Sequence, residues 1–171
     1  MHNIPNTPVG QLIKSGRKAA TARQLNLALA SLCDLTLSYR HARWNVTGGN
    51  FTELQGLFGT FADEVDGLAE RVAEWTVALN SPADATIQAL FDRTNLDPLA
   101  HGVWRQGNLL GVLASRADSF AESLRAAADR TAVDQPTRDV YIDALGFIEG
   151  QRRRLLAHVQ PAYRETVSVA A

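Results

Sequence analysis

Apolar residues recur at every third or fourth position along most of the chain, a spacing that places them on one face of an α-helix. The first such stretch predicts a helix over residues 21–45, with Thr21 suited to cap its start. The second predicts a helix over residues 51–79, about 43 Å long at the usual helical rise. Residues 47–50, which include two adjacent glycines, predict a turn between two antiparallel helices.

A long connection separates these two helices from the rest of the chain. Residues 83–100 hold one short helical stretch, over residues 85–91, and a third long helix is predicted over residues 100–128. Pro136 lies in the first turn of a fourth helix that ends near residue 160. Four long helices with one long crossover after the second are typical of the all-α, ferritin-like four-helix bundle. A plain up-and-down bundle is the alternative that the pattern leaves open.

The pattern divides the chain into a flexible basic N-terminal arm (residues 1–20), the bundle (residues 21–160) and a C-terminal tail (residues 161–171). A chain of 171 residues is long enough for one domain with a substantial core. Apolar residues make up 46% of it and charged residues 20%, as in ordinary globular proteins. The formal net charge of −1 excludes a polycation that binds nucleic acid over its whole surface.

A single cysteine, Cys33, lies within an apolar run. One cysteine cannot form an internal disulfide, which fits a reducing compartment, and burial as a small hydrophobic residue is its expected role. No apolar stretch approaches the roughly 20 residues of a membrane span, and the N-terminal sequence lacks the pattern of a signal peptide. We therefore expect a cytoplasmic protein without a membrane partner.

Basic residues are concentrated near the start of the chain, where four of them precede the first acid: Lys14, Arg17, Lys18 and Arg23. A basic arm contacts phosphates even on a nearly neutral protein, so DNA is a candidate partner. The alternative is a solvated terminus that binds nothing. A second candidate for DNA contact is the run of arginines at residues 152–154, for which a solvated face or salt bridges are the alternative.

Residues 43–51, Arg-Trp-Asn-Val-Thr-Gly-Gly-Asn-Phe, resemble the signature His-Trp-Asn-Val-x-Gly-x-x-Phe of the Dps family of mini-ferritins. In that family the signature joins the first helix to the second, and a short helix follows in the crossover. The resemblance extends over about residues 21–160. It implies a hollow dodecamer of identical subunits that oxidises Fe(II) with peroxide and stores the ferric mineral. It also implies DNA binding, which many members achieve through basic tails.

The resemblance further implies a ferroxidase centre that two subunits share. One subunit supplies two carboxylates a helical turn apart, and an ungapped alignment places them at Glu70 and Glu74. The other supplies two histidines and an acid, but the matching residues here are Arg43, Gln55 and Gly59. Because arginine has no lone pair to give to a metal, half of the iron ligand set is missing.

Two further residues are candidate iron ligands. A gapped alignment matches Asp66 and Glu70 to the family's carboxylates, and Asp66 shares a helical face with Glu70 and Glu74. His41 is the other candidate, because it lies two residues before Arg43 and near the same interface. The alternative for the acids is a solvated face or an ion pair, in which Arg43 neutralises Glu70 or Glu74 across the interface.

The sequence therefore predicts a Dps-like mini-ferritin for iron storage and protection against oxidative stress, with an atypical or degenerate ferroxidase centre. Whether the altered centre still oxidises iron is left open by the residues, and none of them is assigned as catalytic. The alternative is a Dps-like shell without ferroxidase activity that acts as a DNA-binding or structural particle.

Overall fold

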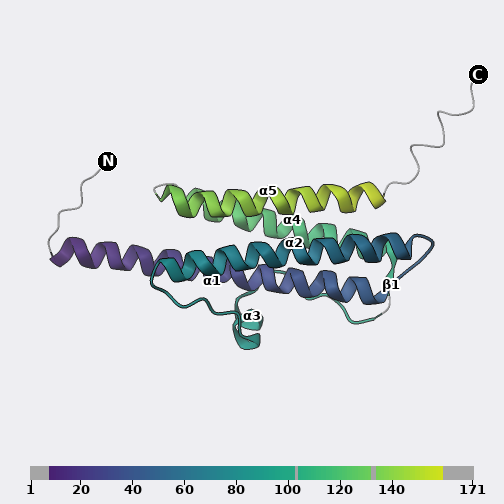
Figure 1. Cartoon of the computed structure of the whole chain (residues 1–171), viewed down its shortest axis with the longest axis horizontal. Helices are drawn as coiled ribbons and strands as arrows, with labels where there is room; N and C mark the ends of the chain where they lie inside the picture. The colour runs from purple at the N-terminus through teal and green to yellow at the C-terminus, as the bar shows by residue number, and fades with distance from the viewer. Residues whose placement is uncertain (1–7, 103, 132–133, 160–171) are drawn as a thin grey trace, which may run out of the picture.

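The computed structural model of the protein describes residues 8–102, 104–131 and 134–159, with side chains from residue 16 onward. In these ranges the chain forms five helices and two short strands: α1 (Pro8–Asn45), β1 (Val46–Thr47), α2 (Phe51–Ala78), α3 (Ile87–Arg93), β2 (Trp104–Arg105), α4 (Gln106–Arg130) and α5 (Gln135–Val159). α1 packs along α2 and α4 along α5, and α3 lies on the flank beside α1 (Figure 1). The predicted all-α bundle with a short crossover helix is confirmed.

The bounds of α2, α3 and α5 agree with the sequence prediction to within a residue or two, whereas α1 does not begin where predicted. It starts at Pro8, so the predicted cap at Thr21 is wrong. Proline fits the first turn of a helix, no other proline occurs in α1, and residues 17–20 are good helix formers. Residues 16–20 are exposed, and this part of α1 extends beyond the bundle (Figure 1). The basic residues therefore lie on a helix rather than on a flexible arm.

The start of α4 also differs from the prediction, because residues 104–105 form a strand instead of a helical turn. β1 pairs with β2 in parallel, with Val46 opposite Trp104. The Thr47 hydroxyl reinforces the bridge by donating to the Trp104 carbonyl oxygen at 3.0 Å. Gly48 follows with φ of 135°, a conformation that side chains disfavour. This bridge ties the end of α1 to the start of α4 and closes that end of the bundle.

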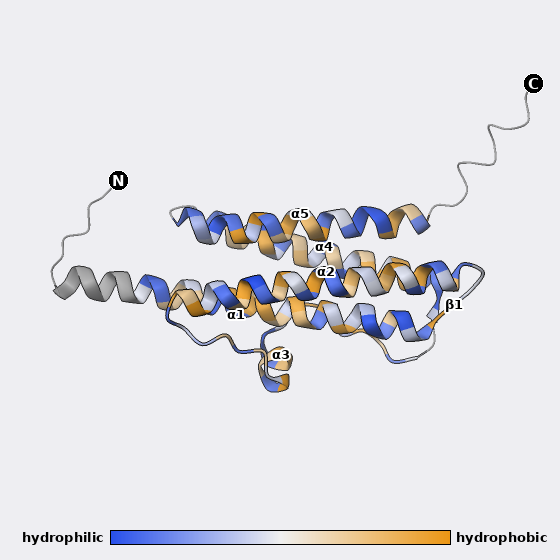
Figure 2. Cartoon of the chain, viewed as in Figure 1, coloured by the Kyte–Doolittle hydropathy of each residue, from blue (hydrophilic) through white to orange (hydrophobic). Residues whose placement is uncertain are grey.

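The core consists mainly of the apolar stripes predicted from the sequence on all four long helices (Figure 2), while Leu37, Phe51 and Val77 of those stripes are exposed. Tyr39 and Phe61 meet edge to face at its centre, with ring centroids 5.3 Å apart. Arg154 covers Phe61 from outside, its guanidinium carbon 4.4 Å from the ring centroid. Such aromatic and cation–π contacts add to the burial of apolar area that stabilises α1 against α2.

Side-chain hydrogen bonds from α1 hold the crossover in place. Asn26 donates to the Pro82 carbonyl oxygen at 3.0 Å and accepts from the Asp84 amide at 2.8 Å. Thr86 then caps α3, its hydroxyl accepting from the Ala89 amide at 3.3 Å. In the described part of the chain, no helix is long and apolar enough to cross a membrane.

Candidate metal centre and nucleic-acid interface

The three predicted carboxylate ligands lie on one face of α2, and all three are exposed: Asp66, Glu70 and Glu74. Their helical spacing of four residues places them in line along the helix. Asp66 forms an exposed ion pair with Arg40 of α1, Nη2 to Oδ2 at 3.6 Å. Within the described ranges, no three His, Cys, Asp or Glu residues lie close enough to hold a metal ion. A single chain therefore presents an incomplete set of ligands, and iron binding by these acids stays a prediction.

Arg43 and Gly59, which the ungapped alignment matches to two of the family's ligand positions, lie in contact. A methyl group at Gly59 would lie 3.5 Å from Nη1 and 3.7 Å from Cζ of Arg43. The guanidinium of Arg43 therefore lies against the backbone where the family has an acid side chain. A permanent cation at this point repels Fe(II) and offers it no lone pair.

His41 is half-buried near the end of α1, and its ring contacts the side chain of Asn45. Its Nδ1 lies 3.5 Å from the amide nitrogen of Asn45, whose side chain also donates to the His41 carbonyl oxygen at 2.9 Å. The other ring nitrogen, Nε2, is buried and has no hydrogen-bond partner among the described residues. Iron binding by His41 stays a prediction.

Cys33 on α1 is half-buried, and its surroundings locate the acids of α2 relative to α1. Burial raises the pKa of the Cys33 thiol, and the negative charges of Asp66 and Glu70 raise it further. Two of the predicted ligands thus lie near the α1 surface that carries Cys33. The elevated pKa keeps the thiol protonated and weakly reactive.

The predicted DNA contacts divide between the two ends of the chain. Arg17, Lys18 and Arg23 are exposed on α1, while the side chain of Lys14 lies outside the described residues. Arg23 lies on another face, because six residues turn a helix by about 240° beyond Arg17.

The second candidate is the arginine run in α5, and two of its three arginines form ion pairs with acids. Arg152 pairs with Asp118 at 2.8 Å and Arg154 with Glu64 at 2.7 Å. These pairs fit the salt-bridge alternative for this run. They leave the start of α1 as the better candidate for contact with DNA phosphates.

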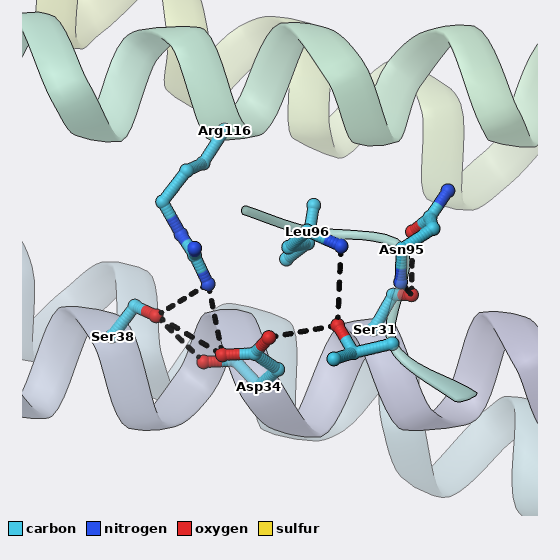
Figure 3. Close-up of polar contacts among 7 residues, drawn as sticks. Ser31, Asp34, Ser38, Asn95, Leu96 and Arg116 are labelled. Carbon is cyan, nitrogen blue, oxygen red and sulfur yellow. Dashed lines mark hydrogen bonds and ion pairs between the residues drawn. The ribbon is translucent and has the colours of Figure 1, made fainter. Parts of the chain in front are cut away.

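Sequence analysis missed a buried polar network around Arg116, which joins α4 to α1 (Figure 3). Arg116 is 4% exposed, and its Nη2 donates to Asp34 Oδ1 at 2.8 Å and to the Ser38 hydroxyl at 3.1 Å. The other oxygen of Asp34 accepts from Thr94 in the crossover at 2.7 Å. Arg116 lies beside the apolar stripe of α4, next to the buried Ala117, and a charged residue at this position was the available signal.

This geometry is that of a ferritin-like four-helix bundle, and comparison with known proteins agrees. No family model matches the chain. It is 30% identical over 150 residues to the DNA protection during starvation protein of Agrobacterium fabrum, covering 86% of this chain and 93% of that protein. DpsA14 from Streptomyces coelicolor has a TM-score of 0.81 at 29% identity, covering 85% of this chain and 87% of that one. Mycobacterium smegmatis Dps has the same fold, with a TM-score of 0.83 at 23% identity and 95% of each chain covered. The chain belongs to the Dps family.

Proposed function

We propose that this protein forms a closed homododecameric shell in the cytoplasm that binds and stores iron, and that its ferroxidase centre is degenerate. Membership in the Dps family supports the shell and the link to iron and DNA protection. A relative in the same family, Dps of Microbacterium arborescens, was solved in a high-iron form at 27% identity to this chain. The degenerate centre is supported by the residues of this chain alone.

Exposed apolar side chains support assembly with further copies of the chain. Trp44 is 72% exposed and Leu37 53%, and they lie seven residues apart on one face of α1. Ile87 and Phe91 of α3 are 80% and 85% exposed on the same flank of the bundle. Large apolar groups of this kind mark protein interfaces in soluble proteins. Asp66 and Glu70 of the predicted ligand set lie near Cys33 of α1.

The contact between Arg43 and Gly59 is the observation that best supports the proposal of a degenerate ferroxidase centre. In the family arrangement, the acids corresponding to Glu70 and Glu74 face two histidines and an acid from a second subunit. Here that second half consists of Arg43, Gln55 and Gly59, so the guanidinium faces the two carboxylates. Arginine and carboxylate pair readily, and the pair replaces the metal as the link between subunits. We expect iron to be oxidised slowly at this point.

The test is an anaerobic Fe(II) titration followed by peroxide, in which ferric absorbance and iron retained per particle are measured. We expect slow oxidation by the natural protein and an increase of at least about tenfold in the triple variant Arg43→His, Gln55→His, Gly59→Asp, which restores the ligands. Adding Glu70→Ala and Glu74→Ala to that variant is the control and should abolish the gain. Rapid oxidation by the natural protein that is lost on Glu70→Ala, Glu74→Ala substitution would refute the degenerate centre.

Binding of DNA is a second proposed function, supported by Arg17 and Lys18 on the exposed start of α1. Each contact releases counterions and is weak and salt-sensitive, but many subunits on one particle multiply it. Charge reversal of Arg17 and Lys18 to Glu should abolish retardation of plasmid in a gel at low salt, while Arg153→Glu should not. Equal retardation by both variants contradicts a role for the start of α1.

A further inference from the structure

A cavity of ≈ 230 Å³ lies between α1 and α4, beside the segment that follows α3. Small residues from both helices line it, Ala28 from α1 and Ala126 and Ala127 from α4, and their short side chains leave the hollow between the helices. Leu27 forms a wall of the cavity and is 40% exposed. An apolar cavity of about 150 Å³ holds one benzene molecule, so this cavity has room for a single ring with a short substituent.

Side-chain hydrogen bonds between the two helices close both ends of this cavity. At one end, Asn95 of the crossover accepts from the Ser31 hydroxyl of α1 at 2.7 Å (Figure 3) and donates to Ser123 of α4. At the other end, Nη2 of Arg130 donates to Oε1 of Gln24 on α1 at 3.2 Å. Gln24 and Ser31 are seven residues apart, about 10 Å along the helix. The hollow is therefore bounded in length as well as in width.

The charge at the mouth of the cavity is positive. Among the described residues that line it, two are arginines and none is acidic. Arg93 is 37% exposed, and its charge is balanced by Asp84, Nη1 to Oδ2 at 2.9 Å. Arg130 is exposed, and the group that it contacts on α1 is the neutral amide of Gln24. A negatively charged group that enters the cavity can therefore reach the guanidinium of Arg130 and is attracted to it.

We propose that this cavity binds a small organic carboxylate whose apolar part is about the size of one ring, with benzoate as the simplest example. The ring lies against Leu27, Ala28 and Ala127 and covers the exposed leucine. The carboxylate accepts hydrogen bonds from the guanidinium of Arg130, which matches its planar geometry. An apolar wall with a few placed polar groups is the usual construction of a small-molecule site. The site lies apart from the acids of α2 and is independent of iron handling.

The test is calorimetric titration of the iron-free full-length protein with benzoate at constant ionic strength, beside titrations with benzyl alcohol and with acetate. Benzyl alcohol carries the ring without the charge, and acetate carries the charge without the ring. We expect saturable binding of benzoate, at least about tenfold tighter than either partial ligand. Arg130→Gln should weaken benzoate binding about tenfold through the lost charge-assisted hydrogen bond. Arg125→Gln is the matched control, because this arginine of α4 pairs with Glu149 of α5 instead, and should leave the affinity unchanged.

A second variant, Ala127→Leu, fills the cavity and should abolish benzoate binding, with thermal unfolding as the check that it folds. If it does not fold, Leu27→Ala at an exposed position takes its place and should weaken binding about fivefold through the lost apolar wall. Absence of saturable benzoate binding by the natural protein would overturn the proposal. Acetate binding as tightly as benzoate, or benzoate binding that neither Arg130→Gln nor the cavity variant weakens, would overturn it equally.

Discussion

Removal of the Asp34 carboxylate is the substitution for which the structure predicts the largest loss of stability. In Asp34→Ala, Arg116 keeps its charge at 4% exposure and loses the partner that lies at 2.8 Å, while Thr94 loses its acceptor at 2.7 Å. Breaking a buried ion pair from one side typically costs about 3–5 kcal/mol in the free energy of unfolding. Asp34 itself has a side chain 26% exposed, so we expect a loss near the lower figure.

The assay is unfolding in guanidinium chloride at one fixed subunit concentration, with sedimentation to confirm that each variant assembles alike. Arg125→Ala is the matched control, because its ion pair with Glu149 is exposed at 53% and 37% and should contribute less than about 1 kcal/mol. The double variant Asp34→Ala, Arg116→Met should recover part of the loss, since it leaves no buried charge unpaired. If Asp34→Ala costs no more than Arg125→Ala, the buried network does not stabilise the fold as argued.

Two further predictions concern the turn after β1 and the buried tyrosines. Gly48→Ala forces a side chain onto φ of 135° and into Gln106, and should cost about 1–3 kcal/mol in thermal unfolding, whereas Gly49→Ala meets no atom within 4 Å and should change little. Burial raises the pKa of Tyr39 and Tyr141 well above the ordinary value. Their contribution to stability is therefore intact below about pH 10 and is lost as the pH rises above it, and an absorbance titration should show both ionising only when the bundle unfolds.

The sequence predicted α2 and α5, whose buried residues recur every three or four positions from Leu54 to Thr76 and from Thr137 to Leu155. It missed the first turns of α1 because residues 16–20 are exposed and a helix without a buried face leaves no periodic signal. It missed the start of α4 because the β1–β2 bridge joins Val46 to Trp104, and no local pattern reports a contact between residues so far apart.

Sequence alone nominates candidate site residues where the type of side chain and its helical spacing indicate a ligand. Glu70 and Glu74 follow from a resemblance and a helical repeat, and the same alignment matches Arg43 and Gly59 to ligand positions but does not predict their contact. The network of Arg116 was not found, because a charged residue in a helix is ordinarily solvated. Its burial depends on Asp34 and Thr94, which come from two other segments of the chain.

The residues matched to the family's ligand positions and the residues of the core occupy different faces of the same helices. On α2, Gln55 and Gly59 each follow a fully buried neighbour, Leu54 and Phe58, and neither is part of the core. Arg43 is likewise exposed on α1, while the preceding Ala42 is buried. Substitution at Arg43, Gln55 and Gly59 therefore changes the charge and chemistry of the surface without creating a cavity, so it costs little stability. For the same reason the variant that restores the ligands should fold like the natural protein, and sedimentation with Fe(II) present checks that it assembles before its oxidation rate is compared.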